Sequence, residues 1–560
     1  MDGLLLRCVC RDIRERLTGA VVARVDQPSS LELHLELYRP DNKSRLVVCA
    51  APNMQGVYLA SSRRSGEPTN FCMLLRKYLE GSRLSGARQM GFSRRLLLDF
   101  ATPSHVCHLT PAASLRVDMF GSRGGLVLLD AEGSVLGSTG ANLEPVAKLS
   151  PQDVTASLLL SWASEMPEVP WSKLLVQKVE GLSSLLAREL VLMAGMRPEA
   201  PCGTTLTEAE TLARCMVSIV EAVDSGKGTP VVYQAQGEVV AYHCVALSQF
   251  SGLEARSFPS CLDAASYYWE AKRRRLALEE RRRRLGSVIS KAIQRLERKA
   301  ALQMEEASRG ADAERLRVMG ELLISYAHLV PAHSKTVELP NYYDPSGERV
   351  SIQLDPSLSA TANAQLYFKR YRKALASQEQ ASEQLAKTRE ELAYLEQVKQ
   401  ALAMAGHSEE ELLPIEEELR AQGYLAHPKG APGKGHKVAG PRKFVTSEGL
   451  EVLVGRNNIQ NDMITFKMAN EEDVWLHAKD CPGAHVVLRK APGWKEWPPA
   501  ASLEEAARIA AFFSKARNSG RAAVDWTFVR HVRKARGARP GMVLYDHHHT
   551  IIVEPGCPDG

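Results

Sequence analysis

Residues 455–488 read GRNNIQNDMITFKMANEEDVWLHAKDCPGAHVVL and are the most informative part of the chain. An amide-rich loop leads through a short helical segment to a predicted strand around Trp475, and a turn at Pro482 and Gly483 begins a second strand. Planar donors, one tryptophan and several cations suit a surface that holds phosphates, sugars and base edges. The same residues could equally form an ordinary surface loop of a small α/β domain.

A basic segment at residues 515–539 extends this candidate interface. Its cations surround Trp526 and Phe528, a combination that suits stacked bases and phosphates, although some of these rings must belong to the core. His477 and His485 could also be metal ligands, but no third ligand lies nearby in the sequence, so we expect no metal and no cofactor. The predicted RNA- or ribosome-binding residues are Arg456, Asn457, Asn458, Asn461, Trp475, His477, Lys479, His485, Arg530, Arg533, Lys534 and Arg536.

The motif GRNN-Q-ND followed by W-H-K-D-PG-H-V resembles the C-terminal domain of the NFACT family, which includes bacterial ribosome quality control factors and proteins called fibronectin-binding. Further blocks follow in the order of that family. They are MDG at 1–3, NFCMLLRKYLEG at 70–81, NYYD at 341–344, LDPSLSATANAQLYFKRYRK at 354–373 and ARPGMVLY at 538–545. Five blocks in register across the chain make the resemblance specific.

The resemblance implies a cytoplasmic factor that binds stalled large ribosomal subunits carrying peptidyl-tRNA. It implies recruitment of charged tRNA, tRNA(Ala) by family analogy, for untemplated C-terminal alanine tailing that marks nascent chains for degradation. The peptide bonds would form in the ribosome, so we expect no enzyme activity and no catalytic residues. A small accessory RNA-binding protein and, from the family name, fibronectin are further possible partners, and no membrane is expected.

The same resemblance implies a tRNA site in the N-terminal domain. The family uses an early aspartate and an Asp-Arg pair, which fall on Asp2 and on Ser93 and Arg94. Serine replaces the family aspartate at position 93, and GSRGG at 121–125 replaces the family's Gly-Arg-His-Ser-Asn stretch. Ribosome docking is therefore better supported than delivery of Ala-tRNA. From the residues alone, Asp2 could simply cap the first helix and Arg94 could lie on the surface.

Charge is unevenly distributed along the chain, whose net charge is +6. Residues 272–299 hold 12 Lys or Arg against 3 Glu, and residues 515–539 hold 8 against Asp525 alone. Two separated basic segments favour two docking surfaces for a polyanion, although such runs also occur on ordinary solvated helix faces.

Length and pattern predict a multidomain α+β protein, since 560 residues exceed a single core. Apolar residues at steps of three and four predict two long helices that form an antiparallel coiled-coil arm. Ser183 is placed to cap the second helix of a helix-hairpin-helix region, although the same residues fit a plain helical connector equally well. A capping box at Ser502 and Glu505 predicts a helix start. The predicted division is an antiparallel-sheet NFACT-N-like domain at 1–165, a helix-hairpin-helix region at 166–262, an arm at 263–427 with a small β module at about 336–358, a linker at 428–443 and an α/β NFACT-R-like domain at 444–556.

Composition excludes several classes of protein. No apolar run approaches the roughly 20 residues of a membrane span, and the first residues lack the pattern of a secretion signal. Eleven cysteines without a CxxC pair give no zinc or redox framework and fit reduced thiols in the cytosol. A surface fibronectin-binding adhesin and a DNA-glycosylase-like nucleic-acid-binding protein remain as alternatives, the second because the family's N-terminal region is similar to glycosylases.

Overall fold

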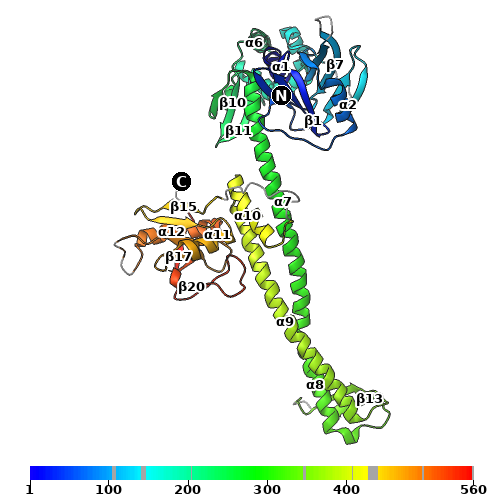
Figure 1. The fold of residues 1–560 in the computed structure, drawn as a ribbon, viewed down its shortest axis with the longest axis vertical. Coiled ribbons are helices and arrows are strands. Elements are labelled where there is room, and N and C mark those ends of the chain that lie inside the picture. The colour runs from blue at the N-terminus through cyan, green and yellow to red at the C-terminus, as the bar shows by residue number, and fades with distance from the viewer. Residues whose placement is uncertain are drawn as a thin grey trace. The chain divides into compact units, whose positions relative to one another are not determined.

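The computed structural model describes residues 1–103, 109–140, 147–202, 205–308, 310–344, 348–406, 408–426, 439–492, 494 and 497–557. Two compact units are present, Met1–Arg275 and Leu276–Gly560 (Figure 1). Across the described ranges, no helix combines the length and the apolar character that a membrane span requires. The predicted linker at 428–443 falls mostly outside the described residues, and the finer predicted division into domains stays a prediction.

The first unit is built on an antiparallel sheet, as the period-two pattern of the sequence predicts. The helix α1 (Gly3–Leu17) contributes nearly continuous apolar side chains to the core, and α2 (Asn70–Leu79) buries Cys72, Leu75 and Leu79. In spatial order the strands are β4 (Gly56–Leu59), β3 (Asn42–Cys49), β2 (Glu32–Arg39), β1 (Val21–Ser29), β5 (Arg83–Gln89), β6 (Arg95–Pro103), β7 (Leu109–Asp118), β8 (Gly125–Leu129) and β9 (Val135–Gly140).

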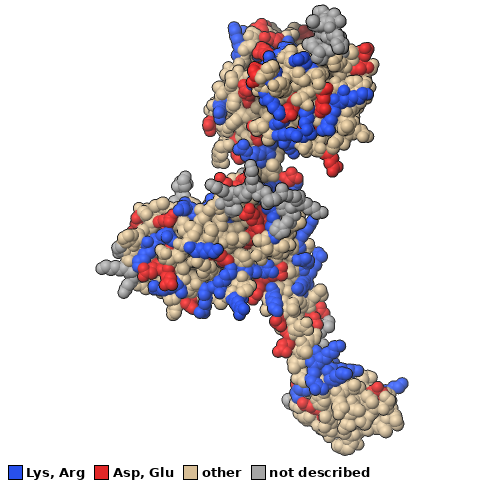
Figure 2. Space-filling model, in the orientation of Figure 1, with Lys and Arg blue, Asp and Glu red and all other residues tan. Residues whose placement is uncertain are grey.

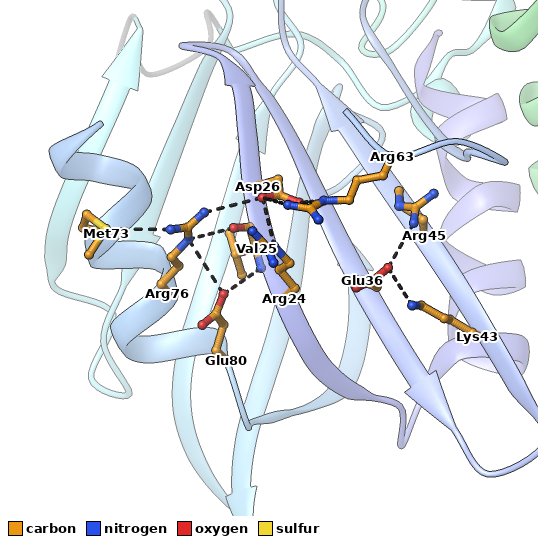
Figure 3. A network of polar contacts seen from close by, with 10 residues as sticks. All are labelled: Arg24, Val25, Asp26, Glu36, Lys43, Arg45, Arg63, Met73, Arg76 and Glu80. Atoms are coloured by element: carbon orange, nitrogen blue, oxygen red, sulfur yellow. Dashed lines mark hydrogen bonds and ion pairs between the residues drawn. The ribbon is translucent and has the colours of Figure 1, made fainter. Parts of the chain in front are cut away.

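A buried carboxylate joins β1, α2 and the extended segment that precedes α2 (Figure 3). Asp26 accepts from Arg63 at 2.8 Å, from Arg24 at 3.2 Å and from Arg76 at 3.5 Å. Burial opposes ionisation of Asp26, but the arginines outweigh it and lower the pKa of this carboxyl. The network therefore anchors α2 to β1, an inner strand of the sheet.

The remaining part of the first unit is mostly helical. A short hairpin joins α4 (Trp171–Lys178) to α5 (Ser184–Met193), and Ser183 caps α5 by accepting from the Leu186 amide at 3.2 Å, as predicted. The other elements are α3 (Ala156–Glu165), α6 (Leu206–Asp224) and a three-stranded sheet of β11 (Glu238–His243), β10 (Val231–Ala235) and β12 (Glu254–Ser257).

The arm consists of α7 (Cys261–Ser308), α8 (Gly310–Ser325) and α9 (Ala360–Met404). Leu285 and Ile289 share a core with Val398 and Leu402, whereas Met319 packs near Tyr367, so α9 runs antiparallel to α7 and α8. The inserted hairpin of β13 (Thr336–Pro340) and β14 (Arg349–Gln353) packs against α8 at the end of the arm (Figure 1). This arrangement confirms the predicted antiparallel helices and the β insertion.

The last domain follows α10 (Glu409–Ala421) and contains a six-stranded sheet. All of its described strand pairs are antiparallel, so the predicted α/β alternation is wrong and the domain is α+β. In spatial order the strands are β15 (Arg442–Val445), β16 (Glu451–Val454), β18 (Val486–Leu488), β17 (Val474–Ala478), β19 (Ala522–Phe528) and β22 (His549–Val553).

One helix, α12 (Ala500–Phe512), covers one face of this sheet. It begins two residues before the predicted start, with Pro499 at the N-cap position. Ser502 instead donates to Glu448, and Glu505 accepts from Ser447. The predicted capping box therefore does not form, because both side chains pair with a neighbouring turn.

Candidate nucleic-acid interface

Three segments of the first unit meet backbone to backbone around Gly3. The Gly3 amide donates to the Gly181 carbonyl at 2.7 Å, and a Cβ on either glycine would lie about 2 Å from the Phe92 carbonyl oxygen. Gln89 bridges the Gly3 and Ser93 carbonyl oxygens at 2.7 and 2.8 Å. The MDG start, the loop before β6 and the α4–α5 hairpin therefore form one site, which requires glycine at both positions.

Asp2 organises this site from within. Its Oδ1 accepts from the Leu5 amide at 2.9 Å and so caps α1, as predicted, while its Oδ2 accepts from Ser183 at 2.8 Å and faces His243 Nε2 at 3.0 Å. Burial alone would raise the pKa of Asp2, but His243 and the Leu5 amide hold it below its usual range. Both carboxylate oxygens are occupied and the residue is buried, so Asp2 positions its neighbours, and its contact with tRNA stays a prediction.

Arg94 is the available cation at this site. Its guanidinium is half-buried and makes no hydrogen bond or ion pair with any residue that the structure describes. Burial lowers the pKa of Arg94, and the Asp2 carboxylate opposes that effect. Ser93 beside it is buried and donates its hydroxyl to the Met90 carbonyl at 2.6 Å, so that side chain does not replace the family carboxylate.

Two further cations lie near Arg94 and were missed in the sequence. Lys148 donates to the Val176 carbonyl at 2.6 Å, and the pKa of its ammonium is lowered by burial and by Arg94. Burial also lowers the pKa of the Met1 amine. The Asp2 carboxylate opposes this shift, and the Arg94 guanidinium adds to it. No local pattern marks either group, since both reach Arg94 through tertiary packing.

The GRNN loop of the second unit docks on α10. Arg456 pairs with Glu411, and Asn457 donates its Nδ2 to the Pro414 carbonyl at 2.7 Å. Asn457 also caps α11 (Asn458–Met463), since its Oδ1 accepts from the Gln460 amide at 2.9 Å. We call these contacts, together with those of Glu418, the joint.

Glu418 is the buried centre of the joint. Its two carboxylate oxygens accept from the Asn458 amide and Nδ2, each at 3.0 Å, and Oε1 also accepts from the Tyr394 hydroxyl at 2.9 Å. Burial raises the pKa of Glu418 to about 7, although these donors oppose the shift. The amides that the sequence assigns to RNA recognition thus hold the last domain against α9 and α10.

The remaining motif residues lie inside the domain. Trp475 is 1% exposed, and His485 donates its backbone amide to the Asn461 Oδ1 at 3.1 Å and pairs through Nδ1 with the Thr465 hydroxyl at 2.9 Å. Burial lowers the pKa of His485 to about 3. His477 is half-buried and stacks on Trp475 with ring centroids 5.8 Å apart.

Five residues of the predicted interface are buried and have a structural role in this domain. Their direct contacts with RNA stay a prediction. The residues concerned are Asn457, Asn458, Asn461, Trp475 and His485.

The predicted cations of the last domain remain at the surface. Arg530 lies over the Phe528 ring at 4.6 Å, Arg533 is 3.5 Å from Asp546, and Lys534 pairs with Asp462. Lys479 is partly exposed and lies 3.5 Å from Asp525, while Arg536 is exposed. Figure 2 shows Lys and Arg side chains gathered over this domain and along the arm.

The helix α7 carries a second exposed set of cations. Lys291, Arg295 and Arg298 follow steps of four and three, which places them on one face, opposite the apolar seam that includes Ile289 and Ile293. Within the described ranges these three make no ion pair. We call them the α7 stripe. Other arginines of the same run take part in ion pairs, since Arg281 and Arg284 share the Glu416 carboxylate.

Comparison with known families matches nearly the whole chain. Residues 2–140 and 142–437 match the NFACT N-terminal and middle domains, and residues 441–546 match the NFACT protein RNA binding domain. The protein named Rqc2 homolog RqcH of Bacillus subtilis (strain 168) is 28% identical over 580 residues, which cover 99% of this chain and 98% of the relative. Its namesake of Streptococcus suis (strain 05ZYH33) is 29% identical over 579 residues, with the same shares covered.

Solved structures give partial matches. The C-terminal part of the fibronectin/fibrinogen-binding protein from Streptococcus suis is 30% identical, with a TM-score of 0.40, and covers 50% of this chain and 96% of that one. The MutM (Fpg) protein from Thermus thermophilus is 16% identical, with a TM-score of 0.22, over 40% of this chain and 77% of that one.

Proposed function

The chain belongs to the NFACT family, and we propose that, within the ribosome quality control role that its relatives support, it binds stalled large ribosomal subunits carrying peptidyl-tRNA and recruits charged tRNA. By resemblance the tRNA is tRNA(Ala), and the result is an untemplated alanine tail that marks the nascent chain for degradation. The protein acts in the cytoplasm as a non-enzymatic adaptor, since the ribosome forms the peptide bonds. Binding to an accessory RNA-binding protein and binding to fibronectin remain predictions.

The observation that carries the tRNA step is the half-buried Arg94 guanidinium, which has no partner among the described residues and lies where three segments meet. A cation held partly out of bulk water without a counter-ion is placed to receive an anion, and a guanidinium matches a phosphate or a base edge. Lys148 adds a second basic side chain near the same position. The α4–α5 hairpin adjoins the site, and we propose that it serves as a helix-hairpin-helix contact to the tRNA backbone.

Ribosome docking is proposed for the exposed cations of the last domain and for the α7 stripe. Phosphate contacts by Lys and Arg supply affinity without base specificity, which suits a large ribonucleoprotein. The joint fixes the last domain to the arm, so that both sets of cations belong to one compact unit.

The test is sequencing of the RNA that co-purifies with the full chain and with Arg94→Ala. We expect large-subunit RNA with both proteins and an enriched tRNA only with the wild type. Arg214→Ala, which removes an exposed arginine of α6, is the matched control and should keep the tRNA. Large-subunit RNA without an enriched tRNA in the wild type would leave docking intact and remove the tailing proposal.

A further inference from the structure

A cluster of metal-ligating side chains lies in the last domain, outside the joint. His531 Nδ1 and His547 Nε2 are 3.7 and 3.9 Å from the same Asp546 carboxylate oxygen. One ligand atom from each of the three residues lies within 4.8 Å of the other two. The two imidazole rings face each other with centroids 4.8 Å apart and an angle of 57° between their planes.

The backbone holds these three residues in place. His531 ends the single turn η7 (Val529–His531), and its carbonyl accepts from the Asp546 amide at 3.3 Å. The hydroxyl of Thr527, which is 1% exposed, donates to the carbonyls of Asp546 and His547 at 3.0 and 3.2 Å. His547 adopts a left-handed φ of +50°, which is uncommon for a residue other than glycine. The ligand-bearing segments are thus braced against a buried residue of β19.

We propose that His531, Asp546 and His547 bind one divalent transition-metal ion of the zinc type. Two imidazoles and a carboxylate are ligands that zinc accepts, and they suit Mg²⁺ and Ca²⁺ poorly. Zinc–nitrogen bonds of about 2.0–2.1 Å place tetrahedral ligand atoms about 3.4 Å apart. The two histidine nitrogens lie 3.7 and 3.9 Å from the Asp546 oxygen, so they must approach it when the metal binds. Small side-chain rotations bring the three atoms together and leave a fourth position open to solvent.

Two arginines neighbour the proposed site, and one of them must move when the metal binds. Arg533 Nη2 is 3.5 Å from the other oxygen of the Asp546 carboxylate, so it can stay. Arg530 Nε donates to His531 Nε2 at 3.3 Å, and that contact opens, because a histidine that ligates through Nδ1 carries its proton on Nε2. Metal binding therefore frees Arg530, which lies at the surface, beside the proposed ribosome contacts.

The test uses the untagged full chain, with Zn²⁺ alone in competition with a chelating dye and Co²⁺ alone for its visible absorption. We expect His531→Gln and His547→Gln to bind one equivalent fewer, or to bind that equivalent at least tenfold more weakly. His548→Gln is the matched control, since the His548 ring contacts Tyr545 and not the cluster. A Co²⁺ spectrum without thiolate charge-transfer bands separates this site from the cysteines.

The control also defines the outcomes that overturn the proposal. If His548→Gln and His547→Gln weaken metal binding equally, the three consecutive histidines bind the metal non-specifically and the proposed site does not exist. Binding by the wild type that neither variant changes would mean that other residues hold the ion. If His531→Gln fails to fold, Asp546→Asn is the second variant. It must weaken metal binding to the same extent. Its melting temperature in EDTA must equal that of the wild type.

Discussion

At the scale of single residues, Glu418 couples the joint to pH. Burial raises the pKa of its carboxyl to about 7, against an ordinary value of 4.5, so the folded chain holds this proton more tightly than the unfolded chain. That stabilisation is complete below pH 4.5 and is lost as pH rises through 7. We expect the wild type to lose about 1–3 kcal/mol relative to Glu418→Gln between pH 5 and 8, measured by thermal melting. Glu417→Gln, which changes a less buried neighbouring residue, is the control. Parallel profiles of stability against pH for the wild type and Glu418→Gln would refute the coupling.

At the scale of elements, α7 has two faces with separate roles. Ile289 is 1% exposed in the seam with α9, so Ile289→Ala should cost about 2–4 kcal/mol of arm stability, measured by urea unfolding with helical circular dichroism. Arg295→Ala removes an exposed cation from the opposite face and should change stability by less than about 0.5 kcal/mol. The same variant should weaken binding to large subunits. Comparable destabilisation by both variants would mean that the stripe belongs to the packing of the arm.

At the scale of the whole molecule, two sets of cations share the proposed ribosome contact. Removing one cation that binds a phosphate should lower the slope of log affinity against log salt by about 0.7–0.9. Replacing Lys291, Arg295 and Arg298 of the stripe together with Arg533 and Arg536 by glutamine should flatten the salt dependence of large-subunit binding. The control is the same substitution at surface arginines of the first unit. If the affinity for large subunits does not change with salt concentration, or does not change when both sets of cations are neutralised, the proposal of electrostatic docking is wrong.

The sequence by itself determined the features that depend on near neighbours. Asp2 and Ser183 cap helices within three residues of themselves, residues 31–38 alternate apolar and polar side chains, and the seam of the arm follows steps of three and four. Five motif blocks in order also established the family, since their spacing is a property of the chain alone.

Only the tertiary structure decided which polar residues are exposed. Asn458 meets Glu418 from 40 residues away, and Asp2 meets His243 from 241 residues away. Trp475 is buried because the face of the sheet that carries it is covered, which no alternation pattern reveals. The amides and the tryptophan resembled an RNA-binding surface because buried and exposed polar groups need the same donors and acceptors. Their partners depend on what packs against them, and that is fixed only when distant segments meet.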